Sequence, residues 1–263
     1  MIGMADGHTG NLVERVVSVD SPSALKRASQ LLRVIWDWTR SIGIAIILFL
    51  IVRIFLVEAF KIPTSSMEGT LLVGDLLLVN KAIYGAEIPL LGTRIPGWKE
   101  PVRSDVVVFN PPHDPIKNYV KRVVGVQGDT LEMRNKVLYV NGIKISEDYT
   151  RHTDRTGADA THSNMSWQRN HLLASKARPR RVDHRSYRPS RDNWGPLSVP
   201  EGSLFVLGDN RDNSEDSRYW GFVSRAAVRG QPWMVYFSFN PESPERISWL
   251  RAVRWNRIGE RVK

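Results

Sequence analysis

An apolar run near the start of the chain, from Ile42 to Val57, is interrupted only by Arg53. At 1.5 Å per residue, a helix over residues 38–60 is long enough to cross a hydrocarbon core of about 30 Å. Arg53 lies near one end, where its long side chain can reach outward. We therefore predict a transmembrane helix over 38–60. The alternatives are a buried helix of a soluble domain and a cleaved signal peptide, although no small-x-small pattern follows the run.

The positive charges that precede this run predict its orientation. Four basic residues lie within the 20 residues before it: Lys26, Arg27, Arg33 and Arg40. Short basic flanks stay on the cytoplasmic side, whereas large domains cross the membrane largely regardless of their charge. We expect residues 1–37 to form a cytoplasmic tail and the rest of the chain after the helix to lie outside.

After the apolar helix, the pattern changes to short apolar runs bounded by Gly, Pro or Asn, which is typical of strands. These runs cover residues 75–81, 105–110, 118–126, 131–133, 137–140, 203–207 and 233–239. Residues 131–133 and 137–140 are spaced as a hairpin around Arg134-Asn135-Lys136, and Asn141-Gly142 begins the next turn. The sequence predicts a mainly β body.

The predicted β body is interrupted by a polar stretch. Residues 145–200 are rich in Arg, His, Ser, Asp and Asn and show little alternation, so we predict a loop-rich insertion there. The β body then consists of residues 61–144 and residues 201–263, of which the last part is a basic tail.

Composition limits the chemistry and the partners. The 263 residues include no cysteine, which excludes a thiol nucleophile, disulfides and Cys-ligated metal. The formal net charge is +10, which suits either nucleic acid or anionic lipid headgroups. Because the chain shows no nucleic-acid-binding motif and does show an apolar span, we expect a lipid bilayer and not nucleic acid as the partner.

A serine six residues beyond the predicted helix is a candidate nucleophile. Ser66 needs a base to react near neutral pH. The six histidines lie in polar, loop-like surroundings or on the other side of the membrane, so a Ser-His-Asp triad is unsupported. Lys121 and Arg122 are both flanked by valines in a predicted strand, and alternation does not choose between them. Only a buried lysine can lose its proton, because a guanidinium stays charged, so Lys121 is the better base. The alternative is a surface lysine on an edge strand.

The polar run from Gly208 to Arg218 has the composition of a rigid, turn-rich loop. Such a loop can present Ser214 to the lysine amine while Asp216 pairs with Arg218. A cation-binding loop and a solvated turn are the alternatives, although the calcium pattern lacks its later Gly and Glu.

Together, three segments resemble the defining motifs of the bacterial type I signal peptidases, which are membrane-bound serine proteases with a Ser-Lys dyad. The segments occur in the family's order: Ser66-Met67 with Thr70-Leu71 and Gly74-Asp75, Tyr119-Val120-Lys121-Arg122-Val123-Val124-Gly125, and Gly208 to Arg218. The resemblance covers roughly residues 36–143 and 197–240. It implies a coiled, mostly antiparallel β body with an extended apolar surface that faces the bilayer.

The resemblance also implies a role for individual residues. Ser66 matches the nucleophile and Lys121 the general base, with Ser214 orienting the lysine and Asp216 and Arg218 bracing the loop that carries it. Thr64 matches a hydroxyl of the oxyanion hole. Five residues match the pockets for alanine-like side chains: Ile62, Met67, Leu71, Tyr119 and Val120. The family uses no metal or cofactor.

The resemblance implies an endopeptidase of the inner, cytoplasmic membrane that removes signal peptides from exported preproteins after an Ala-x-Ala-like motif. Gly69 departs from the family, which usually has proline there, and we expect a looser turn after the nucleophile. The alternatives are an impaired relative that acts as a membrane-bound scaffold, and a self-cleaving repressor relative. The repressor would need a DNA-binding N-terminus and no span.

Overall fold

The computed structural model describes residues 24–85, 93–157, 159–173, 186–241 and 252–263. The chain divides into two units, one that ends at Phe49 and one that comprises Leu50–Lys263. The first unit contributes most of α1 (Ala24–Ile51). Within this helix, Ser29–Ile51 is long and apolar enough to cross a membrane, and its side chains are exposed rather than packed in a core.

The helix ends earlier than the predicted boundary at residue 60. A turn of π-helix, Val52–Leu56, follows α1, and Val57–Lys61 is then a strand, β1. Val57 already has extended backbone angles, and β1 pairs along its whole length with the strand Asp75–Asn80. The apolar run hides this change, because Val57 and the residues after it suit both a spanning helix and a half-buried strand.

The second unit is mainly β, as predicted, and all of its strand pairs are antiparallel. One sheet has seven strands in the order β1, β2 (Asp75–Asn80), β11 (Val228–Ser238), β3 (Val106–Phe109), β4 (Tyr119–Val126), β9 (Ser203–Leu207) and β10 (Val223–Ser224). The other sheet has four strands in the order β7 (Ile143–Lys144), β6 (Val137–Val140), β5 (Thr130–Arg134) and β8 (Trp194–Ser198). The remaining helical elements are short: η2 (Ser65–Met67), η3 (Ala82–Tyr84), η4 (Ser163–His171), α2 (Ser217–Trp220), η5 (Arg225–Ala227) and η6 (Trp255–Arg257).

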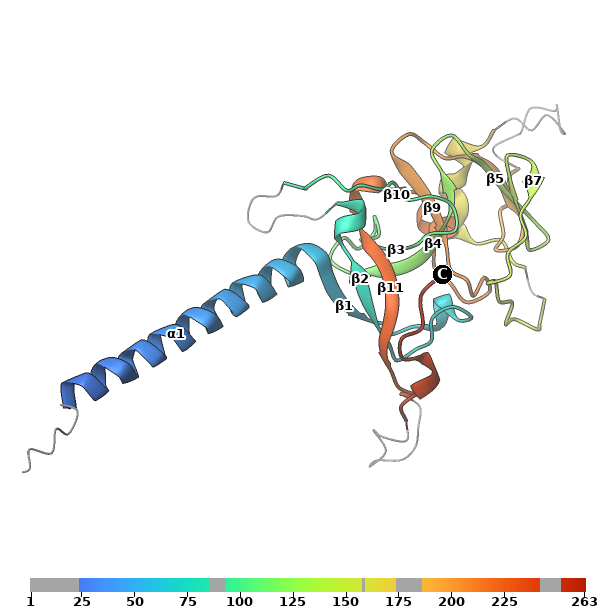
Figure 1. Ribbon diagram of the computed structural model, residues 1–263. Coiled ribbons are helices and arrows are strands. Elements are labelled where there is room, and N and C mark those ends of the chain that lie inside the picture. The colour runs from blue at the N-terminus through green and yellow to red at the C-terminus, as the bar shows by residue number, and fades with distance from the viewer. Residues whose placement is uncertain (1–23, 86–92, 158, 174–185, 242–251) are drawn as a thin grey trace, which may run out of the picture. The chain divides into compact units, whose positions relative to one another are not determined.

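A single long strand holds the seven-stranded sheet together. β11 pairs with β3 near its start and with β2 along most of its length, and its register shifts at two points on the β2 side. Register shifts of this kind bend a strand and increase its twist. Figure 1 shows β11 as a long curved strand between β3 and β2. The sheet therefore coils, and it combines β1, from the early part of the chain, with β11, from the late part.

The predicted hairpin between β5 and β6 is present. Asn135 and Lys136 form its turn and both have positive φ, 48° and 67°. Two central residues with positive φ match the twist of the flanking strands. The polar stretch at 145–200 is not only an insertion, because its end supplies β8, which pairs with β5. Trp194 and Leu197 of β8 are buried in the core, but the Gly-Pro between them hides the strand pattern.

Three apolar clusters fill the body. The cluster that matters for the site lies against β1, β2 and β11 and contains Ile62, Met67, Leu71, Val108 and Val235. It is built from strand residues and from the segment between β1 and β2, so this segment rests on a packed surface.

Candidate active site

Ser66 lies in the short 3₁₀ turn η2, between β1 and β2. Its neighbour Met67 is buried in the apolar cluster just described. The Ser66 carbonyl accepts a 3.1 Å hydrogen bond from the backbone N–H of Asn210. A Cβ on Gly208 would overlap that carbonyl, so the 208–218 loop approaches the turn closely because this residue is glycine. Ser66 is thus held from two sides, with only 8% of its surface exposed.

Lys121 reaches Ser66 from the middle of the sheet. It lies on β4, opposite Val107 of β3, and only 4% of its surface is exposed. Its Nζ is 2.6 Å from Ser66 Oγ, which is hydrogen-bond distance. The structure therefore brings the predicted nucleophile and the predicted base together from segments 55 residues apart.

Burial controls the protonation of this lysine. Loss of solvation lowers the pKa of Lys121 from 10.5 to about 8. The carboxylate of Asp216 opposes this shift, and the guanidinium of Arg218 adds to it. A substantial fraction of the amine is consequently neutral just above neutral pH, where it can accept a proton.

The neighbouring arginine points away from Ser66 and has a structural partner. Arg122 donates from Nε and Nη2 to the two carboxylate oxygens of Asp209, at 2.8 and 2.7 Å, and both side chains are fully buried. Thr70 also donates to Asp209, at 2.6 Å. The pair ties β4 to the loop beyond β9 and to the segment after the serine. This role of Arg122 and Asp209 was not predicted from the sequence, although an arginine between buried valines requires a buried acceptor.

The predicted pair of Asp216 and Arg218 is present and buried. Arg218 donates from Nε and Nη2 to the two carboxylate oxygens, at 2.8 Å each. Asp216 also accepts a 3.1 Å hydrogen bond from the backbone N–H of Gly208. The arginine and these hydrogen bonds outweigh the effect of burial and lower the pKa of the Asp216 carboxyl. The pair fixes the fold of the loop that touches Ser66.

The two other predicted hydroxyl groups, those of Thr64 and Ser214, lie close to Ser66 and Lys121 but form weak hydrogen bonds at most. Thr64 Oγ1 is 3.4 Å from Ser66 Oγ. Ser214 Oγ is buried and makes no well-formed hydrogen bond within the described part of the chain, although it lies near enough to Asp216 to help lower the pKa of that carboxyl. A bond from Ser214 to Lys121 is thus not among the contacts of this structure.

A cleft of about 530 Å³ opens beside Ser66 and Lys121. Four of the predicted substrate-binding residues line it: Ile62, Met67, Tyr119 and Val120. Leu71 does not line the cleft but is buried in the same apolar cluster as Met67. The cleft also includes residues that the sequence analysis did not assign: Phe60, Lys61, Pro63, Lys117, Asn118, Asn213 and Glu215.

Gly69 takes a backbone path that differs from the one that the family's proline would impose. Its φ is +110°, whereas proline is fixed near −65°. A Cβ at this position would lie 3.0 Å from Cγ of Arg151 and 3.1 Å from the Tyr149 carbonyl. The backbone here takes a path that proline cannot follow, and another segment of the chain covers it. The expectation of a looser turn stays a prediction, and the path of the backbone explains why a glycine is accommodated here.

That covering segment, residues 147–154, is part of the polar stretch whose contacts the sequence could not predict. Arg151 donates its backbone N–H to the Asp209 carbonyl at 2.8 Å and accepts from the N–H of Arg211 at 2.9 Å. Arg211 in turn donates to both carboxylate oxygens of Glu147, at 2.9 and 2.6 Å. The covering segment thus holds the 208–218 loop through two backbone hydrogen bonds and one ion pair.

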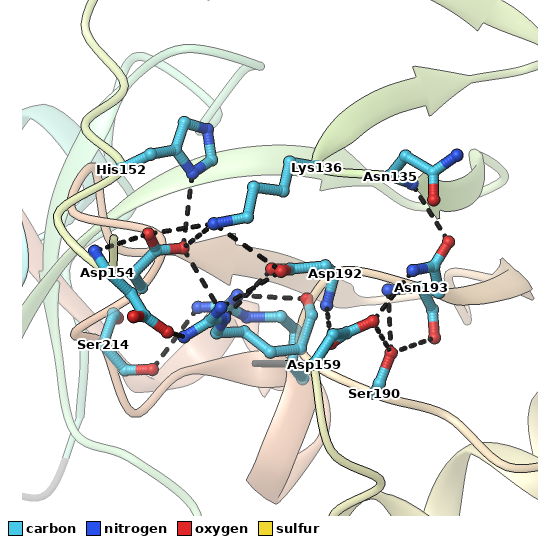
Figure 2. A network of polar contacts seen from close by, with 12 residues as sticks. Asn135, Lys136, His152, Asp154, Asp159, Ser190, Asp192, Asn193 and Ser214 are labelled. Carbon is cyan, nitrogen blue, oxygen red and sulfur yellow. Dashed lines mark hydrogen bonds and ion pairs between the residues drawn. The ribbon is translucent and has the colours of Figure 1, made fainter. Parts of the chain in front are cut away.

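A second group of contacts connects the same loop to the four-stranded sheet. Figure 2 shows Lys136, from the β5–β6 turn, beside Asp192 and His152 in one polar network. Lys136 Nζ lies 3.0 Å from a carboxylate oxygen of Asp212, and His152 Nδ1 lies 3.3 Å from the same oxygen. Arg218 Nη2 reaches the Ser214 carbonyl at 3.4 Å, so the network extends to the buried loop. Among the residues that the structure describes, no group of three acidic or histidine side chains is placed to hold a metal ion.

Comparison with known proteins gives consistent matches. A family model described as signal peptidase, peptidase S26, matches residues 35–237. Signal peptidase I of Pseudomonas aeruginosa is 38% identical over 77% of this chain and 72% of its own. Signal peptidase I of Aquifex aeolicus is 34% identical over 80% of this chain and 88% of its own. A solved signal peptidase I from Enterococcus faecalis is 36% identical and covers 51% of this chain and 97% of its own, but the TM-score of 0.33 is too low to compare the folds.

Proposed function

The chain belongs to the signal peptidase I family, peptidase S26, and we propose that Ser66 and Lys121 are its catalytic pair. It is a peptidase that removes signal peptides from exported preproteins. The observation that carries the proposal is the 2.6 Å approach of Lys121 Nζ to Ser66 Oγ, at the wall of a cleft and away from solvent. Burial lowers the pKa of the lysine to about 8, which suits it to accept a proton from the hydroxyl.

In the first step, Lys121 takes the Ser66 proton while Oγ forms a bond to the scissile carbonyl carbon. The carbonyl oxygen becomes an oxyanion, which the Thr64 hydroxyl and the Ser66 backbone N–H stabilise. When the intermediate collapses, the C–N bond breaks and Lys121 returns the proton to the leaving amine. Water then attacks the acyl-enzyme, with Lys121 again as the base, and releases the signal peptide. We expect Ser214 to orient the lysine during the reaction, because its buried hydroxyl makes no well-formed hydrogen bond among the described residues, while Asp216 and Arg218 hold its loop.

The cleft supports cleavage after an Ala-x-Ala-like motif. Its apolar wall includes Ile62, Met67, Tyr119 and Val120, which suit small side chains before the scissile bond. Leu71 supports this apolar wall, because it packs in the same cluster as Met67. No metal or cofactor takes part in this mechanism.

The membrane setting agrees with this substrate class. The apolar helix and the family together indicate a single-pass membrane protein. We propose that its N-terminus is cytoplasmic and that its body lies outside the inner membrane, because the basic residues Lys26, Arg27, Arg33 and Arg40 precede the apolar run that begins at Ile42. The net charge of +10 favours anionic headgroups next to the body. An anchored enzyme meets signal peptides where their own apolar segments lie in the bilayer.

Cleavage of a preprotein bearing Ala-x-Ala by the detergent-solubilised protein tests the proposal. We expect the wild type to cut after the second alanine, and Ser66→Ala and Lys121→Ala each to lose at least about 10³-fold in rate. Ser65→Ala is the matched control, because it removes the adjacent hydroxyl without touching the pair. Cleavage that survives Lys121→Ala would exclude this lysine as the base. A folded wild type that cuts no preprotein would instead favour the scaffold alternative.

A further inference from the structure

The substrate cleft contains one acidic side chain among its lining residues that the structure describes, Glu215. It lies next to Ser214 in the 208–218 loop and is exposed, in contrast to its buried neighbours. Its carboxylate makes no hydrogen bond or ion pair with any described residue. Nothing in the fold of the loop therefore requires a glutamate here, and its charge is available to a bound chain.

The two basic side chains of the cleft apart from Lys121 do not neutralise Glu215. Lys117 forms an ion pair of 2.8 Å with Asp114, outside the cleft lining. Lys61 Nζ lies over the ring of Phe239, 5.3 Å from its centroid. The carboxylate does act on Lys121, since it is one of the groups that oppose the lowering of its pKa by burial. Glu215 is thus within electrostatic range of the reacting atoms but is unpaired.

The position of Glu215 indicates which part of a substrate it meets. The small side chains before the scissile bond need the apolar wall around Ile62 and Val120. Glu215 and Asn213 are polar lining residues from the 208–218 loop, and Asn213 donates a 2.9 Å hydrogen bond to the Ser65 hydroxyl. Because the residues before the scissile bond occupy the apolar wall, the polar lining from this loop is left for the residues after it.

We propose that Glu215 selects the first residues after the scissile bond, which become the N-terminus of the released protein. It favours basic and neutral side chains there and disfavours acidic ones. This specificity rests on the proposed function, because it presupposes that Ser66 attacks a peptide bond held in this cleft. The exported proteins that this enzyme processes best would then carry few acidic residues at their mature N-termini.

The test compares two peptides that differ only in the residue after the scissile bond, lysine in one and glutamate in the other. For the wild type we expect kcat/KM to be about tenfold higher for the lysine peptide, equal to about 1.4 kcal/mol, because attraction and repulsion each contribute modestly at an exposed site. Glu215→Gln should bring the ratio close to one, and Glu215→Lys should invert it. Raising the salt concentration should shrink the wild-type ratio.

The ratio within each enzyme cancels any general loss of activity, including a change at Lys121. Glu201→Gln is the matched control, because Glu201 is exposed and lies outside the cleft lining, and it should keep the wild-type ratio. An unchanged ratio in Glu215→Gln, with the peptides still cut, would overturn this inference alone. If the wild type cuts neither of these peptides nor an alanine version, the proposed function fails and the inference fails with it.

Discussion

At the scale of single residues, the chemistry of the site depends on the burial of the Lys121 amine. Lys121 is enclosed by strand residues, and this enclosure, more than any single charge, lowers its pKa. The nearby charges oppose one another, since Asp216 raises the pKa and Arg218 lowers it. The pKa of the proposed base is therefore set by packing, and substitutions that expose the amine to solvent should raise it.

Activity should depend on pH through this lysine. The reaction needs the neutral amine, so kcat/KM should rise as the pH increases and should level off above a midpoint of about 8. A pH–rate profile with a short peptide measures this. A midpoint near 10.5, the ordinary value for lysine, would show that the amine is not buried in the working enzyme.

The same lysine should make the protein less stable. Its pKa falls from 10.5 to about 8, so the charged form is penalised in the folded state. At about 1.36 kcal/mol per unit, this costs about 3 kcal/mol below pH 8. Lys121→Met should therefore raise the free energy of unfolding at pH 7 while it abolishes cleavage. The gain should fade between pH 8 and pH 10.5, which urea unfolding at several pH values can measure.

Gly69 should not tolerate the family's proline. Gly69→Pro needs a backbone change from a φ of +110°, and we expect at least a tenfold loss of kcat/KM because the turn that carries Ser66 shifts. Adding Arg151→Ala should not restore activity, because the strain lies in the backbone and not only in the contact. Rescue by the double variant would show that the covering side chain is the obstacle.

The residues of the proposed catalytic pair could be singled out from the sequence because their motifs are distinctive, and the structure brings their side chains within 2.6 Å of each other. The alternation of side chains along the strand does not show whether Lys121 or Arg122 is the base. Only the ability of a lysine to lose its proton distinguishes the two. The partner of Arg122 could not be predicted, because Asp209 is 87 residues away and their contact depends on how the strands pair. The path of Gly69 was also out of reach, since a motif gives a residue type and not a backbone angle.

At the scale of elements, the strands from β2 to β6 and β9 were predictable to within about two residues from their apolar runs. β1 was not, because it continues the apolar helix without a break in hydrophobicity. β8 was missed because Gly195 and Pro196 interrupt it, and the start of β11 because Gly230 and Pro232 obscure its pattern. In each case pairing with a neighbouring strand overrides the local preference.

The buried pair of Arg122 and Asp209 joins β4 to the loop beyond β9 and, through Thr70, to the segment after Ser66. Arg122→Met leaves Asp209 buried without its partner, and we expect a loss of about 3–5 kcal/mol in the free energy of unfolding together with lower activity. Arg225→Met is the control, since its pair with Glu100 is exposed and should contribute less than about 1 kcal/mol. Similar losses in the two variants, measured by urea unfolding, would contradict this assignment.

At the scale of the whole molecule, the fold class was predictable but the order of the strands was not. The order depends on β11, which comes last along the chain and yet lies between β2 and β3. Nothing in the local pattern of a strand specifies a neighbour that lies so far away in the chain.

The end of α1 gives a prediction about truncation. A chain that starts at Val52 keeps β1 and should fold and cut peptides, and it should bind vesicles more weakly than the full chain because it lacks the spanning helix. A chain that starts at Ile62 exposes the edge of β2, with five residue pairs lost, and should melt at least several degrees lower. Circular dichroism and vesicle sedimentation measure the two outcomes. Equal melting temperatures would show that β1 belongs to the membrane anchor and not to the body.

The distance between the reacting residues along the chain has a consequence for when the enzyme becomes active. Ser66 must meet a lysine 55 residues later, and its carbonyl must meet a loop more than twice as far away. Contacts of such long range form late, after the loops between them have closed. During synthesis the serine therefore emerges long before its base and its supporting loop. The protease should become active only after β9 and β11 have paired with their neighbouring strands, so an unfinished chain cannot cut other proteins or itself.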